Sequence, residues 1–103
     1  MSHVTTHVLD AALGRPAPGI PVTLRGDSLV AEGLTDADGR VASLGPDLLE
    51  PGRYSITFDT GAYFGDAPHF YPVVTVDFVI SDASHYHVPL LLSPFAFSTY
   101  RGS

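Results

Sequence analysis

The sequence contains no cysteine and no lysine, and each absence excludes a class of chemistry. Without cysteine the chain has no disulfide framework, no thiolate nucleophile and no cysteine-based zinc or iron–sulfur site. Its only strongly basic residues are five arginines against eleven acidic residues, which gives a formal net charge of −6. Such a chain offers no basic face to the phosphates of a nucleic acid. Nucleic acid is therefore not an expected partner.

Long apolar runs are also missing, and no basic segment followed by an apolar stretch opens the chain. A membrane-spanning helix needs roughly 20 consecutive apolar residues. A secretory signal peptide needs a positively charged start before its apolar region. We therefore expect no membrane partner and a cytoplasmic location, which also fits the lack of cysteine.

The residues that are present describe a compact, turn-rich chain. Of its 103 residues, 45% are hydrophobic and only 16% are charged, and ten glycines and nine prolines supply turns. This composition is typical of a globular fold and not of a disordered or fibrous chain. The length suits one domain and is too short for two conventional cores. We expect a single domain over residues 1–103.

Short segments that alternate apolar and polar residues predict β-strands. Strands are expected at residues 4–9, 20–24, 52–60, 73–80 and 85–92, with a further short strand led by Val41. The turn at residues 81–84 predicts a hairpin between the last two long strands. Residues 61–68 are predicted as a loop with room for one short helix. The expected fold class is therefore all-β: a two-sheet antiparallel β-sandwich.

Histidines carry the clearest chemical signal. His85 and His87 stand two residues apart on one predicted strand, so their side chains point to the same face. His7 occupies the face of its strand opposite Val4 and Val8. Three histidines are a known ligand set for catalytic zinc. A metal-free acid/base site needs fewer assumptions, since imidazole titrates near neutrality. Partly exposed histidines with ordinary hydrogen bonds are the third interpretation.

An acid/base site of this kind would need a cation, and Arg40 or Arg101 could steady a developing negative charge. Arg40 follows the turn at residues 36–39 and could equally be an ordinary surface residue. Asp36 and Asp38 lack the third ligand and the distant glutamate of a calcium loop. The C-terminal serines lack the Gly-x-Ser-x-Gly elbow of a serine hydrolase. Calcium binding and serine nucleophilic catalysis are therefore not expected.

Three separated blocks resemble one known family over the whole chain. The C-terminal block reads His85-Tyr86-His87-Val88-Pro89-Leu90-Leu91-Leu92-Ser93-Pro94 and ends in Ser98-Thr99-Tyr100-Arg101-Gly102-Ser103. The other two are Thr6-His7-Val8-Leu9-Asp10 with Gly14-Arg15-Pro16-Ala17, and Thr35-Asp36-Ala37-Asp38-Gly39-Arg40. In this order they resemble the 5-hydroxyisourate hydrolases, also called transthyretin-related proteins, whose signature is the Tyr-Arg-Gly-Ser ending.

The resemblance implies a transthyretin-like sandwich of about eight strands, assembled as a homotetramer that is a dimer of dimers. It implies cofactor-free hydrolysis of 5-hydroxyisourate, in the conversion of urate to allantoin, with no metal. The catalytic residues carried over are His7, Arg40, His87 and Ser103. The substrate-binding residues carried over are Tyr100, Arg101, Gly102 and His85. One of His7 and His87 would be the general base and the other would donate or hold a proton, and the resemblance does not say which is which.

One segment departs from the family pattern, and two rival functions are considered. Phe95-Ala96-Phe97 stands where relatives commonly have Tyr-Gly-Tyr, so two hydroxyls are missing while the catalytic set is intact. A transthyretin-like protein that binds a small molecule without chemistry is the main rival. It would be expected to lack His7, His87 and the Tyr-Arg-Gly-Ser ending. An immunoglobulin-like structural module would explain the strands but not the histidines.

Overall fold

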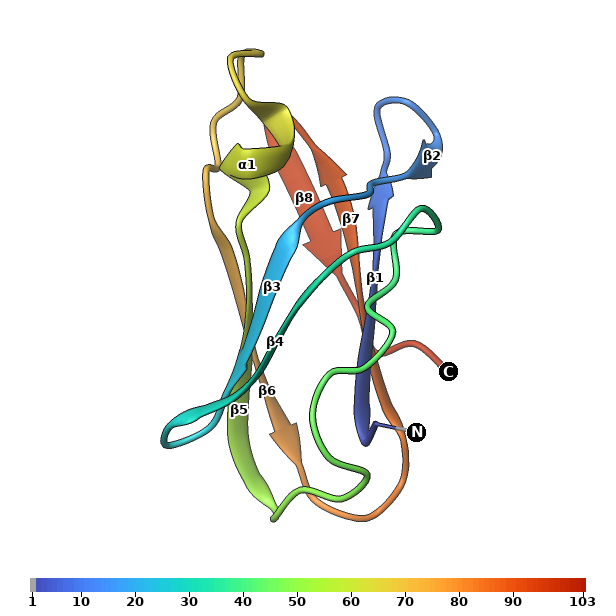
Figure 1. Cartoon of the computed structure of the whole chain (residues 1–103), viewed down its shortest axis with the longest axis vertical. Helices are drawn as coiled ribbons and strands as arrows, with labels where there is room; N and C mark the ends of the chain where they lie inside the picture. The colour runs from blue at the N-terminus through green and yellow to red at the C-terminus, as the bar shows by residue number, and fades with distance from the viewer. Residues whose placement is uncertain (1) are drawn as a thin grey trace.

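The computed structural model describes residues 2–103. Within them the chain forms eight strands and one short helix (Figure 1). In chain order these are β1 (Val4–Asp10), β2 (Arg15–Pro16), β3 (Pro21–Arg25), β4 (Leu29–Leu34), β5 (Gly52–Phe58), α1 (Thr60–Phe64), β6 (Val74–Ile80), β7 (Tyr86–Ser93) and β8 (Ala96–Thr99). No helix in this part of the chain is long and apolar enough to cross a membrane.

The strands form two four-stranded sheets packed face to face. One sheet has the order β2-β1-β7-β8 and the other β4-β3-β5-β6. Figure 1 shows the two layers side by side, with α1 at one end of the sandwich and the C-terminus leaving beside β1. The predicted all-β two-sheet sandwich is confirmed, and the short helix falls at the start of the loop that the sequence allowed for it.

The core lies between the sheets and follows the period-two pattern of the strands. In β1 every second residue from Val4 is buried, and in β5 the side chains of Ile56 and Phe58 are fully buried. From β7, the neighbour of β1 in its sheet, Val88, Leu90 and Leu92 are also buried. Burying an aliphatic or Phe side chain contributes about 1.5 to 3 kcal/mol, so this alternation fixes which face of each strand turns inward.

One strand pair is parallel, although the sequence predicted antiparallel sheets. β1 runs parallel to β7, with Thr5 opposite His87 and His7 opposite Pro89. The remaining strand pairs between residues 2 and 103 are antiparallel. Because β1 begins the chain and β7 nearly ends it, this pair brings two distant segments together at the centre of one sheet.

The sequence predicted one hairpin and one short strand that do not form among residues 2–103. The expected hairpin between residues 73–80 and 85–92 does not form, because β6 and β7 belong to different sheets and their turn crosses the end of the sandwich. The expected strand led by Val41 does not form either: the backbone of residues 41–51 is irregular, and Arg40, just before them, makes an isolated bridge to His7. Three strands were missed: β2 has two residues, while β4 and β8 have no fully buried position.

A buried carboxylate ties α1 to the end of β1. Asp10 is 4% exposed, and its Oδ1 accepts hydrogen bonds from the backbone N–H groups of Ala12 and Leu13, both at 3.0 Å. Its Oδ2 accepts a hydrogen bond of 2.7 Å from the Tyr63 hydroxyl. Burial and the neighbouring carboxylate raise the pKa of Tyr63 to about 12. Ionised Tyr63 would place a second negative charge beside Asp10.

We expect Tyr63→Phe to lower the free energy of unfolding by about 1 to 3 kcal/mol at pH 7, because a hydrogen bond to a carboxylate is lost. The folded-state pKa of Tyr63 lies above its unfolded value of 10.0. Its contribution is therefore complete below pH 10 and is lost as the pH rises towards 12. Urea unfolding across this range should show the wild-type advantage over Tyr63→Phe shrinking. A constant difference between the two proteins would contradict the assignment.

Candidate active site

The outer face of the parallel β1–β7 pair carries the histidines. His7 and His87 both point away from the core and are half-buried. Thr5 lies directly opposite His87 in the register, and its Oγ1 is 2.8 Å from Nδ1 of His87 and 2.8 Å from Nε2 of His85. The sequence prediction that these histidines share a face is confirmed, and Thr5 joins them.

The turn at residues 36–39 delivers Arg40 to the same face. Gly39 has a φ of 76°, and a Cβ atom there would lie 2.4 Å from the carbonyl oxygen of Val8, so only glycine fits this approach. The backbone N–H of Val8 donates to the carbonyl of Gly39 at 2.8 Å, and Arg40 makes a β-bridge to His7. Asp36 Oδ1 accepts hydrogen bonds from the backbone N–H groups of Asp38 and Arg40. These bonds make the Asp36 carboxylate a cap of the turn.

The C-terminal tail folds back onto His87. The backbone N–H of Gly102 donates to the His87 carbonyl at 2.8 Å. A Cβ atom at Gly102 would lie 2.6 Å from Cδ2 of His87, so a larger residue would push the tail or the imidazole away. This close approach brings the next residue, Ser103, beside the histidines.

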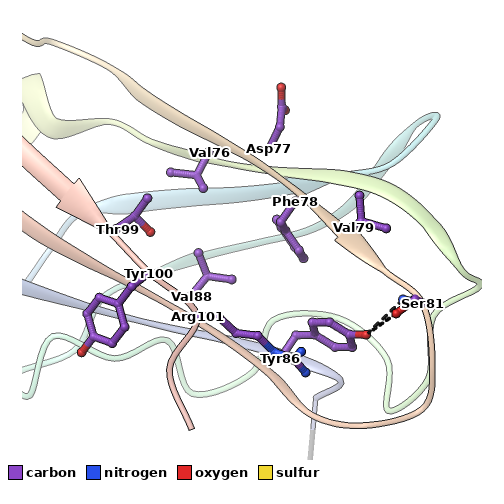
Figure 2. Close-up of a pocket in the computed structure, with 10 residues that line it drawn as sticks. All are labelled: Val76, Asp77, Phe78, Val79, Ser81, Tyr86, Val88, Thr99, Tyr100 and Arg101. Carbon is purple, nitrogen blue, oxygen red and sulfur yellow. Dashed lines mark hydrogen bonds between the residues drawn. The ribbon is translucent and has the colours of Figure 1, made fainter.

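Arg101 anchors this tail from the other side. Its guanidinium lies 4.2 Å from the centre of the Tyr86 ring, a cation–π contact. The Tyr86 hydroxyl donates to Asp82 Oδ1 at 3.0 Å and accepts from the backbone N–H of Ser81 at 3.0 Å. Figure 2 shows Arg101 beside the Tyr86 ring and the bond from Tyr86 to Ser81. Arg101 and Tyr86 therefore fix the position from which Gly102 reaches His87.

The site residues predicted from the sequence lie in two separate hollows. An open depression of about 340 Å³ is lined by Thr5, Thr6, Arg40, Val41, His85, His87 and Ser103. A second cleft of about 330 Å³, between the edges of the two sheets, includes Tyr100 and Arg101 and is floored by Val76, Phe78 and Val88 (Figure 2). Three of the four predicted catalytic residues line the depression, and the fourth, His7, is bridged to Arg40. The first two tail residues, Tyr100 and Arg101, line the cleft.

The electrostatics of the depression favour a neutral His87. Burial lowers the pKa of His87, and coulombic repulsion from Arg40, together with that from the neighbouring His7 and His85 imidazoles in their protonated forms, lowers it further. Within residues 2–103 no carboxylate pairs with the Arg40 guanidinium. The imidazole of His87 is thus available as a base near pH 7, and Arg40 is available to an anion.

Metal ligation by these histidines finds no geometric support. In the described part of the chain, no three His, Asp or Glu side chains are arranged to hold a metal ion. The hydroxyl of Thr5 lies between His85 and His87 and bonds one nitrogen of each. The three-histidine zinc site considered from the sequence is not formed.

Thr5 is the site residue that sequence reasoning missed. It lies two residues before His7, and the period of a strand places both on one face. That signal was present in the sequence. Its meaning was hidden because the parallel pairing that sets Thr5 opposite His87 joins residues 82 positions apart.

The fold and this cluster define a class: a small two-sheet sandwich with histidines on one outer sheet face, beside an arginine that has no carboxylate partner among residues 2–103. The chain belongs to the HIUase/Transthyretin family, whose model matches residues 4–102. It is 49% identical to a protein of Rhizobium meliloti named 5-hydroxyisourate hydrolase 2, over 97% of this chain and 95% of the relative. It is 44% identical to the 5-hydroxyisourate hydrolase of Caulobacter vibrioides, over 100% of both chains.

Solved structures agree with this family. The 5-hydroxyisourate hydrolase of Klebsiella pneumoniae superposes with a TM-score of 0.88 at 42% identity, covering 97% of this chain and 98% of that one. Sea bream transthyretin in complex with thyroxine superposes almost as well, with a TM-score of 0.87 at 31% identity, covering 96% and 93%. The family resemblance predicted from the sequence is confirmed, and the backbone alone does not separate its two kinds of member.

We expect Arg40→Gln to raise the pKa of His87, because it removes a positive charge that disfavours the imidazolium. The pKa should still remain lower than that of an ordinary exposed histidine, since burial is the larger cause of the shift. A pH titration of the His87 Hε1 chemical shift by NMR measures this directly. Arg53→Gln is the control, because Arg53 pairs with Asp77 on the other sheet and should leave His87 unchanged. An unchanged His87 pKa in Arg40→Gln would show that the two groups do not interact.

Proposed function

We propose that this protein hydrolyses 5-hydroxyisourate to 2-oxo-4-hydroxy-4-carboxy-5-ureidoimidazoline, in the breakdown of urate to allantoin. The observation that carries the proposal is the convergence of His87, Arg40 and Ser103 on one depression with His7 beside it. Relatives that match nearly the whole chain bear the name 5-hydroxyisourate hydrolase. They confirm the sequence-based prediction that the protein is a hydrolase of this substrate.

The proposed chemistry is opening of a ring amide bond by water. Of the two histidines, the neutral and half-buried His87 suits the general base that takes a proton from water. The Arg40 guanidinium, which pairs with no carboxylate of residues 2–103, suits the stabilisation of the oxyanion that forms on the attacked carbonyl. His7 and Ser103 complete the proposed catalytic set. In this proposal His85 and Gly102 border the substrate pocket, and Tyr100 and Arg101, which line the second cleft, hold the tail that carries Gly102 and Ser103. No cofactor takes part.

The rival function is binding of a small molecule without chemistry, and the backbone cannot decide against it. A transthyretin structure with thyroxine has almost the same TM-score as a hydrolase structure. The residues favour catalysis, because a carrier has no need of a neutral imidazole beside an unpaired guanidinium in an open, polar depression. The presence of His7, His87 and the Tyr-Arg-Gly-Ser ending supports the same choice.

The decisive assay follows the ultraviolet decay of freshly generated 5-hydroxyisourate in buffer containing EDTA. The wild-type protein should accelerate decay strongly. His87→Ala and Arg40→Ala should each lower turnover by on the order of 100-fold or more, because a base or an oxyanion donor is lost. His69→Ala and Arg53→Ala are matched controls outside the site and should keep wild-type activity.

Two results would contradict this proposal. A fully active His87→Ala variant would remove His87 from the catalytic set. Decay at the spontaneous rate with a folded wild-type protein would favour the binding function, and thyroxine-like aromatic ligands would then be tested by calorimetry. Loss of wild-type activity in EDTA, restored by added zinc, would revive the metal interpretation.

The oligomeric state and the cellular location of the protein are proposed as well. We propose a homotetramer, a dimer of dimers, which is supported by the open edges of β6 and β8 and by exposed apolar side chains near them. These side chains are Val79, Phe95 and Phe97. Sedimentation velocity should give four times the chain mass of 10.9 kDa. An active monomer would overturn the proposed assembly.

The cytoplasmic location stays a prediction, which fractionation of the source cells would test.

A further inference from the structure

A single hydroxyl bridges two imidazoles at the proposed site. Thr5 Oγ1 lies 2.8 Å from Nδ1 of His87 and 2.8 Å from Nε2 of His85. The parallel register sets Thr5 directly opposite His87, and His85 precedes the first residue of β7. His87 is half-buried, whereas His85 is exposed. The three side chains thus form a hydrogen-bonded chain from the depression to solvent.

The number of protons shared by the Thr5 hydroxyl and the two imidazoles limits the hydrogen bonds that these three side chains can make. A hydroxyl has one proton, so Thr5 donates to one imidazole and accepts from the other. If Thr5 donates to Nε2 of His85, it accepts from a protonated Nδ1 of His87, and Nε2 of His87 keeps its lone pair. If Thr5 donates to Nδ1 of His87, the proton of His87 must be on Nε2. The tautomers of the two histidines are therefore coupled through Thr5.

Only the first arrangement gives His87 a basic nitrogen facing away from Thr5. Among residues 2–103, Nδ1 of His87 is bonded to Thr5, and Nε2 has no protein partner. Gly102 lies so close to the Cδ2 edge of the same ring that an added Cβ atom would come within 2.6 Å of it, which leaves the ring little room to turn on that side. Thr5 and Gly102 together fix both the tautomer and the orientation that a general base requires.

We propose that Thr5 is a positioning residue that holds His87 in its basic tautomer and relays the proton taken from water to His85. This inference rests on the proposed hydrolase function of the same site. It assigns His87 as the base and gives His85 a role as the exit to solvent. Neither histidine needs a metal or cofactor in this relay.

The proton transfers balance over one turnover. One O–H bond of water breaks as its oxygen bonds to the amide carbonyl carbon, and the proton goes to Nε2 of His87. The Nδ1 proton of His87 moves to Thr5 Oγ1 as the hydroxyl proton moves to Nε2 of His85. His85 then releases its Nδ1 proton to bulk water. The reverse transfers reset the chain when His87 gives its Nε2 proton to the departing ring nitrogen.

The test compares Thr5→Val, which removes the hydroxyl but keeps a β-branched side chain, with Thr5→Ser, which keeps the hydroxyl. We expect Thr5→Val to lower kcat by about 10- to 100-fold with little change in KM, as for other residues that orient a functional histidine. Thr5→Ser should stay within a few-fold of wild type. Thr57→Val is the control, because it removes a hydroxyl from an outer-face threonine pair on the other sheet.

Two further readouts separate a relay from a purely structural role. His85→Gln should lower kcat to a similar extent, and the Thr5→Val/His85→Gln double variant should be no worse than either single variant. Without substrate, nitrogen-15 chemical shifts should show His87 protonated at Nδ1 in the wild type, with this preference lost in Thr5→Val. Both readouts are compared at one pH, because Arg40, His7 and His85 also influence the pKa of His87.

The kinetics of the variants and the nitrogen-15 chemical shifts can each overturn the inference. Wild-type kcat in Thr5→Val, or additive losses in the double variant, would remove the relay. A His87 protonated at Nε2 in the wild type would remove the tautomer assignment. The chemical-shift measurement needs no substrate, so a protein inactive on 5-hydroxyisourate but with the predicted tautomers would fail the proposed function and leave the coupling of the histidines intact.

Discussion

The site depends on the parallel hydrogen-bonded pairing of β1 with β7. This pair lies in the middle of its sheet, and its register sets Thr5 opposite His87. Burial of Val4 and Val8 on one strand and of Val88 on the other locks that register, since a slip by one residue would turn the apolar side chains to solvent and His87 into the core. The same apolar contacts that stabilise the sandwich therefore aim the imidazoles outward.

Around that pair, two other segments are brought in by backbone contacts that allow little variation. Gly39 lets Arg40 approach β1, and Gly102 lets the tail lie against His87. At each position a Cβ atom would meet its neighbour within 2.6 Å. The resulting depression holds an arginine that pairs with no carboxylate in the described chain, beside an imidazole that burial keeps neutral. The scaffold is shared with a transthyretin solved in complex with thyroxine, so the proposed hydrolase function depends on these few side chains and not on the backbone.

Much of the fold could be predicted because alternation of apolar and polar residues is a local property. The buried positions in β5 and β6 follow that alternation as expected, with Ile56, Phe58, Val74 and Ile80 inside. Connections could not be predicted in this way. The turn at residues 81–84 has the composition of a hairpin turn, yet it crosses between the sheets. The exposed β4 and β8 have no buried stripe for periodicity to detect.

The sequence by itself determined the class of fold, the family and the side chains able to do acid/base chemistry, because these follow from local patterns and from motifs read along the chain. Only the tertiary structure decided how those side chains act on one another. Thr5 and His87 are 82 residues apart, and no local pattern shows that β1 pairs with β7 in parallel. The bridging hydroxyl, the tail against His87 and the lowered pKa of that imidazole all arise from this long-range pairing and the burial that accompanies it.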